Sequence, residues 1–181
     1  MTVVPGFGGQ KFMPEALPKA KQLRANAHFI KPHGLPAEGH EASALAMALI
    51  MRSAMTLPDF RTITATTRKV IPWVGNEYSR VLENKNRLLT TYEGANGGKT
   101  GYTKAAGRIL VSGAKRNGRQ LIAVTINAPD DWNDHSVMIN NGFQNYKHQL
   151  IIASGDMVGT LDVVGGSISQ VDLVATEDFY Y

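Results

Sequence analysis

The stretch that decides the fold is rich in glycine and runs Gly94-Ala95-Asn96-Gly97-Gly98-Lys99-Thr100-Gly101-Tyr102-Thr103. Glycines before Lys99-Thr100 match part of the phosphate-binding pattern G-x-x-x-x-G-K-[ST], but that pattern needs a glycine at position 93, which is Glu93. A phosphate-binding loop also needs a helix directly after the Lys-Thr pair, because the amides at the helix N-terminus hold the phosphates. The apolar run at residues 109–111 predicts a strand instead. The sequence therefore excludes a phosphate-binding loop.

A second interpretation is a Lys-Thr-Gly motif on an exposed strand beside an acyl-transfer site. Lys99 would place a compact positive charge next to a substrate carboxylate, and the Thr100 hydroxyl would donate a hydrogen bond to the same group. Gly101 has no side chain, so a peptide could lie against the strand backbone. The alternative is a glycine-rich turn that enters an ordinary strand, and these three residues by themselves do not separate the two.

Further segments support the second interpretation in order along the chain, namely residues 28–36, 84–89, 94–103, 114–124 and 141–143. From about residue 25 the chain resembles the D-alanyl-D-alanine carboxypeptidases, the low-molecular-weight penicillin-binding proteins that trim peptidoglycan. This resemblance implies a serine-type hydrolase that works outside the cytoplasmic membrane on peptidoglycan stem peptides and binds β-lactams. It also implies that Lys99 and Thr100 hold the terminal carboxylate, with Gly101 completing the motif, and that the backbone N–H of Tyr102 completes the oxyanion hole.

Two motifs that the resemblance calls for are missing. The family needs a Ser-x-x-Lys at a helix start, which supplies the nucleophile and its base, and a Ser-x-Asn on a nearby loop. No Ser-x-Asn occurs in the 181 residues, and the single Ser-x-x-Lys, from Ser112 to Lys115, falls in a predicted strand. Residues three apart on a strand point to opposite faces, so Ser112 and Lys115 are not expected to act together. We therefore assign no nucleophile and expect the chain alone to be inactive. The alternatives are a non-catalytic module that binds stem peptide or β-lactam, and a chimeric remnant without a selected function.

The first 24 residues do not share the resemblance. Residues 1–14 resemble an internal strand and glycine-rich loop of ribulose-phosphate 3-epimerase, and residues 17–24 read as the start of the following helix. One strand and one loop cannot close an eight-stranded barrel, so we expect a fusion remnant, with weak phosphate binding by the loop as the alternative. The predicted domains are an epimerase-like fragment at 1–24, a partial transpeptidase-like catalytic domain at 25–147 and the start of a truncated β-rich C-terminal domain at 148–181.

Hydrophobic periodicity predicts a mixed architecture. A helix is expected over residues 41–55, a strand over 66–73 and a helix over 130–146. Strands at 108–114 and 120–127 flank Asn117-Gly118, the strongest hairpin signal in the chain. From residue 147 the pattern changes to short alternating segments. The predicted fold class is α+β, an incomplete β-lactamase/transpeptidase-like domain in which an antiparallel meander has flanking helices. With part of that domain missing, we expect Ile109, Val111, Leu121 and Val124 to be uncovered on one face and the open sheet edge to favour self-association.

Composition limits the remaining function classes. The net charge is +4 with no basic run, and we predict no nucleic-acid partner. There is no cysteine, and the five histidines show no His-x-His or His-x-x-x-His spacing, so we predict neither a metal site nor a cofactor. No apolar run approaches the roughly 20 residues of a membrane span. The N-terminus lacks the layout of an export signal, so we expect the chain as written to stay in the cytoplasm if it is expressed alone.

Overall fold

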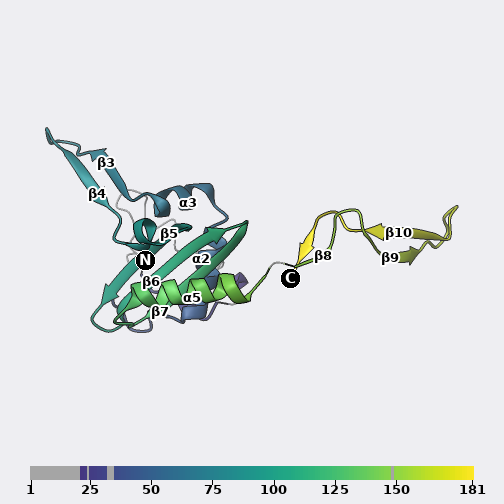
Figure 1. Ribbon diagram of the computed structural model, residues 1–181, viewed down its shortest axis with the longest axis horizontal. Helices are drawn as coiled ribbons and strands as arrows, with labels where there is room; N and C mark the ends of the chain where they lie inside the picture. The colour runs from purple at the N-terminus through teal and green to yellow at the C-terminus, as the bar shows by residue number, and fades with distance from the viewer. Residues whose placement is uncertain (1–20, 24, 32–34, 148) are drawn as a thin grey trace. The chain divides into compact units, whose positions relative to one another are not determined.

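The computed structural model describes residues 21–23, 25–31, 35–147 and 149–181. These residues form two compact units that divide between Gly142 and Phe143 (Figure 1). The segment compared with an epimerase lies almost entirely outside the described residues. Both units mix strands with turns, and the first also contains the helices, so the predicted α+β class is confirmed.

The first unit is built on a three-stranded antiparallel sheet in the order β5-β6-β7. Its strands are β5 (Ala95–Thr103), β6 (Gly107–Arg116) and β7 (Arg119–Ile126). Asn117 and Gly118 form the two-residue turn between β6 and β7, with φ angles of 48° and 80°. Asparagine and glycine tolerate this left-handed conformation, which suits the twist of a tight hairpin. The meander predicted from the sequence is confirmed.

One face of the sheet is covered by helices α2 (Ala44–Ala54) and α3 (Pro58–Ala65). Val111 on β6 packs there with Met51 and Met55 and is only 5% exposed, while Val124 on β7 packs against the same cluster. Our prediction that these two valines would be uncovered is therefore wrong. The cover comes from α2, which has an apolar face in its own sequence. Ser43 caps the first turn of this helix, because its Oγ accepts a hydrogen bond from the Ala46 N–H at 3.1 Å.

Helix α5 (Asp131–Asn145) covers the opposite face, as Figure 1 shows. Successive residues of a strand point to opposite faces, so Ser112 turns away from the α2 side and contacts His135 of α5. Ile139, one turn further along the helix, is buried with it. The sheet thus lies between α5 on one side and α2 with α3 on the other.

Smaller elements complete the first unit. The two-residue strands β1 (Ala27–His28) and β2 (Glu41–Ala42) pair with each other, and so do β3 (Arg68–Pro72) and β4 (Ser79–Glu83). Strand β4 has no counterpart among the predictions, because its five residues are all exposed and carry no apolar alternation. The short helix α4 (Leu88–Thr91) contacts β5 directly before the glycine-rich stretch.

The second unit consists of two antiparallel strand pairs. One joins β8 (Leu150–Ile152) to β11 (Phe179–Tyr180), and the other joins β9 (Met157–Asp162) to β10 (Gln170–Val174). Among the residues described from 149 to 181, none is buried. The pairing of Leu161 with Val171 and of Asp162 with Gln170 gives the β9–β10 pair one apolar and one polar face.

Candidate functional site

Strand β5 is one of the two outer strands of the described sheet and carries the Lys-Thr-Gly motif at its centre. Lys99, Thr100, Gly101 and Tyr102 lie opposite Val111, Leu110, Ile109 and Arg108 of β6, respectively. Because opposite residues of an antiparallel pair share a face, Thr100 and Tyr102 lie on the α5 face, and Lys99 and Gly101 lie on the other. The motif therefore offers groups on both faces of an outer strand.

The glycines just before the motif permit close packing of the strand. Gly98 has a φ of 144°, and a Cβ at this position would come within 2.4 Å of the Val111 carbonyl oxygen and 2.8 Å of Asn86 Nδ2. Gly101 differs, because a Cβ there would meet nothing closer than the Cβ of Ile109 at 3.7 Å. Gly98 is therefore required by the fold, whereas packing leaves room for a side chain at Gly101.

Lys99 is held close to its own strand. Its Nζ donates a hydrogen bond to the carbonyl oxygen of Thr100 at 2.6 Å. Partial burial lowers the pKa of Lys99 from its ordinary value of 10.5, because desolvation disfavours the charged amine. An anion placed beside the amine would offset this penalty.

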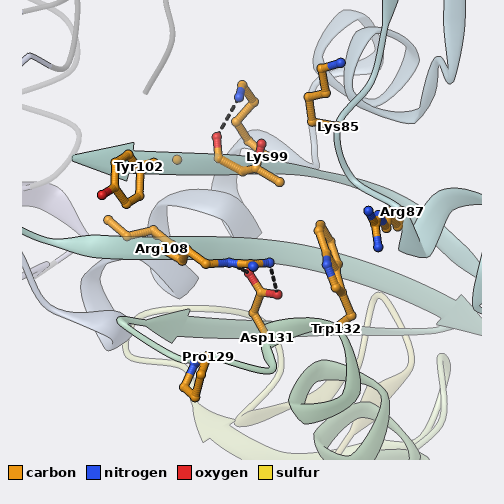
Figure 2. Close-up of a pocket in the computed structure, with 11 residues that line it drawn as sticks. Lys85, Arg87, Lys99, Tyr102, Arg108, Pro129, Asp131 and Trp132 are labelled. Atoms are coloured by element: carbon orange, nitrogen blue, oxygen red, sulfur yellow. Dashed lines mark hydrogen bonds and ion pairs between the residues drawn. The ribbon is translucent and has the colours of Figure 1, made fainter. Parts of the chain in front are cut away.

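An open hollow of about 760 Å³ lies along the motif (Figure 2), lined by Lys85, Arg87, Lys99, Thr100, Gly101, Tyr102, Arg108, Ile109, Pro129, Asp131 and Trp132. The four site residues predicted from sequence are thus brought together in one hollow. Its volume falls in the range of about 300–1,000 Å³ that is typical of ligand pockets.

Arg108 and Asp131 form the best-defined polar contact in the hollow. Two nitrogens of the Arg108 guanidinium donate to the Asp131 carboxylate, at 2.6 Å and 3.1 Å. Asp131 is 2% exposed, while the guanidinium carbon of Arg108 lies 6.0 Å from the Trp132 ring centre. This bidentate geometry fixes the guanidinium beside the motif and satisfies the only carboxylate among the lining residues.

Sequence reasoning missed the other seven lining residues: Lys85, Arg87, Arg108, Ile109, Pro129, Asp131 and Trp132. Arg108 and Asp131 are 23 positions apart in the sequence, so no local sequence pattern predicts that they pair. Lys85 and Arg87 did leave a signal that was not used. They alternate with Asn84, Asn86 and Leu88, and such alternation at a strand end indicates a segment with one inward and one outward side.

The Ser-x-x-Lys lies within β6, as predicted. Ser112 is fully buried, whereas Lys115 is exposed. The Ser112 Oγ lies 2.6 Å from Nδ1 of His135, and the Thr125 Oγ1 lies 3.1 Å from its Nε2. Burial lowers the pKa of His135 from 6.5 to about 4, outweighing the nearby Asp131 carboxylate and a backbone hydrogen bond at Leu110. A neutral imidazole between two hydroxyls, closed off from the hollow, fits a structural role better than a nucleophile and its base.

In the part of the chain that the structure describes, no three His, Asp or Glu side chains converge in a way that could hold a metal ion. Within the same residues, no helix has the length and apolar character that a membrane span requires.

Comparison with known proteins places this geometry in a family. The family model described as D-alanyl-D-alanine carboxypeptidase matches residues 4–130. D-alanyl-D-alanine carboxypeptidase DacB2 of Mycobacterium tuberculosis is 34% identical over 134 residues, 69% of this chain and 45% of that protein. The Bacillus subtilis carboxypeptidase DacF is 29% identical over 172 residues, 93% of this chain and 44% of that protein. The chain therefore spans about half the length of the curated relatives it matches.

Solved structures agree with the sequence matches. Penicillin-binding protein 5 from Haemophilus influenzae is 26% identical with a TM-score of 0.75, covering 94% of this chain and 50% of that one. A D-alanyl-D-alanine carboxypeptidase from M. tuberculosis is 33% identical with a TM-score of 0.64, covering 71% of this chain and 52% of that one. The transpeptidase-like fold is thereby confirmed. The family match starts at residue 4, inside the segment compared with an epimerase, and gives that comparison no support.

Proposed function

We infer the function from family membership: the chain belongs to the D-alanyl-D-alanine carboxypeptidase family, and we propose that its β5 strand binds peptides ending in D-alanyl-D-alanine. In peptidoglycan these are the stem peptides. Lys99 and Thr100 would hold the terminal carboxylate, the peptide backbone would lie over Gly101, and the Tyr102 N–H would face the carbonyl group under attack.

The observation that carries this proposal is the placement of Lys99, Thr100 and Gly101 on an outer strand of the described sheet and along an open hollow. An outer strand offers backbone groups that an extended peptide can pair with. Lys99 is partly desolvated, so a carboxylate gains more from its charge than it would in open solvent. Gly101 leaves space directly against the strand.

We propose that these 181 residues bind the peptide without cleaving it. They contain no Ser-x-Asn, and the serine of their single Ser-x-x-Lys, Ser112, is buried in β6, where Lys115 is exposed. Hydrolysis in this family would require a nucleophile that these residues do not supply. Binding of a β-lactam at the same strand follows from the same groups, because it too carries a carboxylate beside an acyl carbon.

Several finer points stay part of the proposal. We expect the chain to divide into segments 1–24, 25–147 and 148–181. We also expect a site of action outside the cytoplasmic membrane, and self-association through the open edge of β5. The competing candidate is a chimeric remnant without a selected function. The exposed apolar strands of residues 149–181 favour that candidate, because an isolated unit gains little stability from residues that stay in water.

Binding of the tripeptide acetyl-L-Gln-D-Ala-D-Ala, followed by NMR chemical-shift perturbation, tests the proposal. We expect shifts along β5, and we expect them to disappear in Lys99→Gln and with a C-terminally amidated peptide. Lys104→Gln changes an exposed lysine that does not line the hollow and should leave binding unchanged. Equal binding of the acid and the amide would refute the assignment of Lys99 to the terminal carboxylate.

A further inference from the structure

Strand β5 changes its register with β6 just before the Lys-Thr-Gly motif. Ala95 lies opposite Ala114, and the next paired residue of β5, Gly97, lies opposite Gly113. Asn96 is therefore an extra residue between two paired ones. Such a β-bulge inserts one residue into one strand of an antiparallel pair, and bulges often re-aim side chains next to functional sites. The pairing after the bulge thus differs by one position from the pairing before it.

The bulge decides which face of the sheet each motif residue occupies. In the observed register Lys99 lies opposite Val111, on the face covered by α2 and α3, and Thr100 lies opposite the buried Leu110 on the α5 face. If the pairing before the bulge continued, Lys99 would lie opposite Leu110. A slip of one residue moves every side chain to the other face, so the Lys99 amine would turn toward α5. Figure 2 shows the actual arrangement, in which this amine and Asp131 lie on opposite sides of β5.

Two amide side chains hold the bulge in place. Asn96 Nδ2 donates to Gln120 Oε1 on β7 at 2.6 Å, and Gln120 Nε2 donates back to Asn96 Oδ1 at 3.2 Å. This amide pair reaches across the middle strand over Gly113, where a Cβ would come within 2.9 Å of Gln120 Nε2 and 3.0 Å of Asn96 Oδ1. Because Gly113 has no side chain, β5 and β7 can be joined directly above β6.

The neighbours of the amide pair are fixed as well. Gln120 Nε2 also donates to the carbonyl oxygens of Ala114 and Leu121, at 3.2 Å and 3.0 Å. The residue directly after the bulge is held by Asn86, which is 2% exposed and whose Nδ2 donates to the Gly97 carbonyl oxygen at 3.4 Å. The bulge is therefore secured both from β7 and from the segment before α4.

We propose that Asn96 and Gln120 are positioning residues for the Lys-Thr-Gly motif, because their amide pair locks the bulge that sets the faces of Lys99 and Thr100. This inference rests on the proposed function, in which Lys99 and Thr100 hold the terminal carboxylate. Neither amide is among the residues that line the hollow, so the pair acts through the strand and not by touching a peptide. Loss of the amide pair lets part of the molecules adopt the slipped register, in which the Lys99 amine points away from the carboxylate.

Exchanging the two amides tests this lock. Asn96→Gln adds one methylene to the pair and Gln120→Asn removes one, whereas the double substitution restores the combined length. The readout is the ratio of the dissociation constants of acetyl-L-Gln-D-Ala-D-Ala and its C-terminal amide for the full chain, measured by NMR titration. We expect each single variant to reduce the preference for the acid by about fivefold, as the loss of a hydrogen bond provides, and the double variant to restore it. Asn76→Gln adds the same methylene at an exposed asparagine and should leave the preference unchanged.

The register itself provides a second readout. Opposite residues of an antiparallel pair are close enough for cross-strand backbone NOEs, so the unaltered chain and the double variant should show a contact between Lys99 and Val111. Each single variant should lose intensity there and gain a contact between Lys99 and Leu110. Unchanged NOEs in both single variants would overturn the lock, including the case in which they bind acid and amide equally less tightly.

The two readouts keep this inference separate from the proposed function. If the unaltered chain does not prefer the acid over the amide, the proposed function fails, and the NOEs of the single variants still decide whether the amide pair sets the register. If the unaltered chain prefers the acid and both single variants keep that preference, the positioning role is refuted and the proposed function stands.

Discussion

The hydroxyl of Ser112 lies 2.6 Å from Nδ1 of His135, which joins the middle of strand β6 to helix α5. The other imidazole nitrogen contacts Thr125 Oγ1 on β7, so one side chain ties together two strands and a helix. Both Ser112 and His135 are fully buried. A serine beside a histidine can suggest a nucleophile and its base, but here the pair satisfies polar groups inside the core.

The first prediction follows from the neutral state of His135. Its pKa is about 4 in the folded chain and 6.5 as the ordinary value, so between these pH values the unfolded chain binds more protons. The free energy of unfolding should therefore fall as the pH falls from 6.5 to 4. Below pH 4 the protonation of His135 should cause no further decrease in the free energy of unfolding. The loss is about 3 kcal/mol at most. Urea unfolding at a series of pH values measures it.

A histidine outside the core provides the control for this pH effect. His135→Gln should flatten the dependence between pH 6.5 and 4, whatever it costs in absolute stability, because no titrating group remains between the two hydroxyls. His28→Gln changes an exposed histidine and should keep the full slope. An identical slope in the unaltered chain and in His135→Gln would show that other groups control acid unfolding.

The second prediction concerns covalent chemistry. After incubation with benzylpenicillin, intact-mass spectrometry should show no penicilloyl adduct on this chain. Ser112 is fully buried and Lys115 is exposed, so no lysine assists the only serine that has a lysine three residues later. A stoichiometric adduct that disappears in Ser112→Ala would contradict this assignment of Ser112 to the core.

The third prediction separates two glycines of the same strand. Gly98→Ala should cost about 2 kcal/mol or more, because the added methyl meets the Val111 carbonyl and φ is 144°. Gly101→Ala should change stability by less than about 1 kcal/mol, since its nearest contact is 3.7 Å. The proposed binding mode nevertheless requires Gly101→Ala to weaken acetyl-L-Gln-D-Ala-D-Ala by about tenfold, because the methyl would stand between peptide and strand. Thermal melts and NMR titrations of the two variants measure these effects, and undiminished affinity in Gly101→Ala would argue against a peptide lying over this position.

The sequence predicted the parts of the fold that depend on local signals. Asn117-Gly118 determined the β6–β7 hairpin, and the apolar face of residues 41–55 determined helix α2, although its first helical residue is Ala44. The Lys-Thr-Gly motif is also a local pattern, and it located strand β5. Strand β4 was missed because it pairs only with β3 in an exposed ribbon, where neither burial nor alternation marks it.

The sequence could not predict contacts between distant residues. The pair of Arg108 with Asp131 and the contact of Ser112 with His135 each join residues 23 positions apart. Both depend on how helix α5 crosses the sheet, which tertiary packing determines. The same limit explains why Val111 was expected to be uncovered, since its cover comes from Met51 and Met55 on a helix far earlier in the chain.

The last prediction concerns self-association. The apolar face of the β9–β10 pair leaves Leu161 55% and Leu173 39% exposed, and its other face carries Thr160, Asp162 and Asp172. Covering such a face would contribute about 1.5–3 kcal/mol for each large side chain, so sedimentation velocity should show association that grows with concentration. Leu161→Lys should reduce it, whereas Thr160→Lys, on the polar face of the same strand, should not. Association that is equal in both variants but is suppressed by a D-Ala-D-Ala peptide would instead indicate pairing through the outer edge of β5.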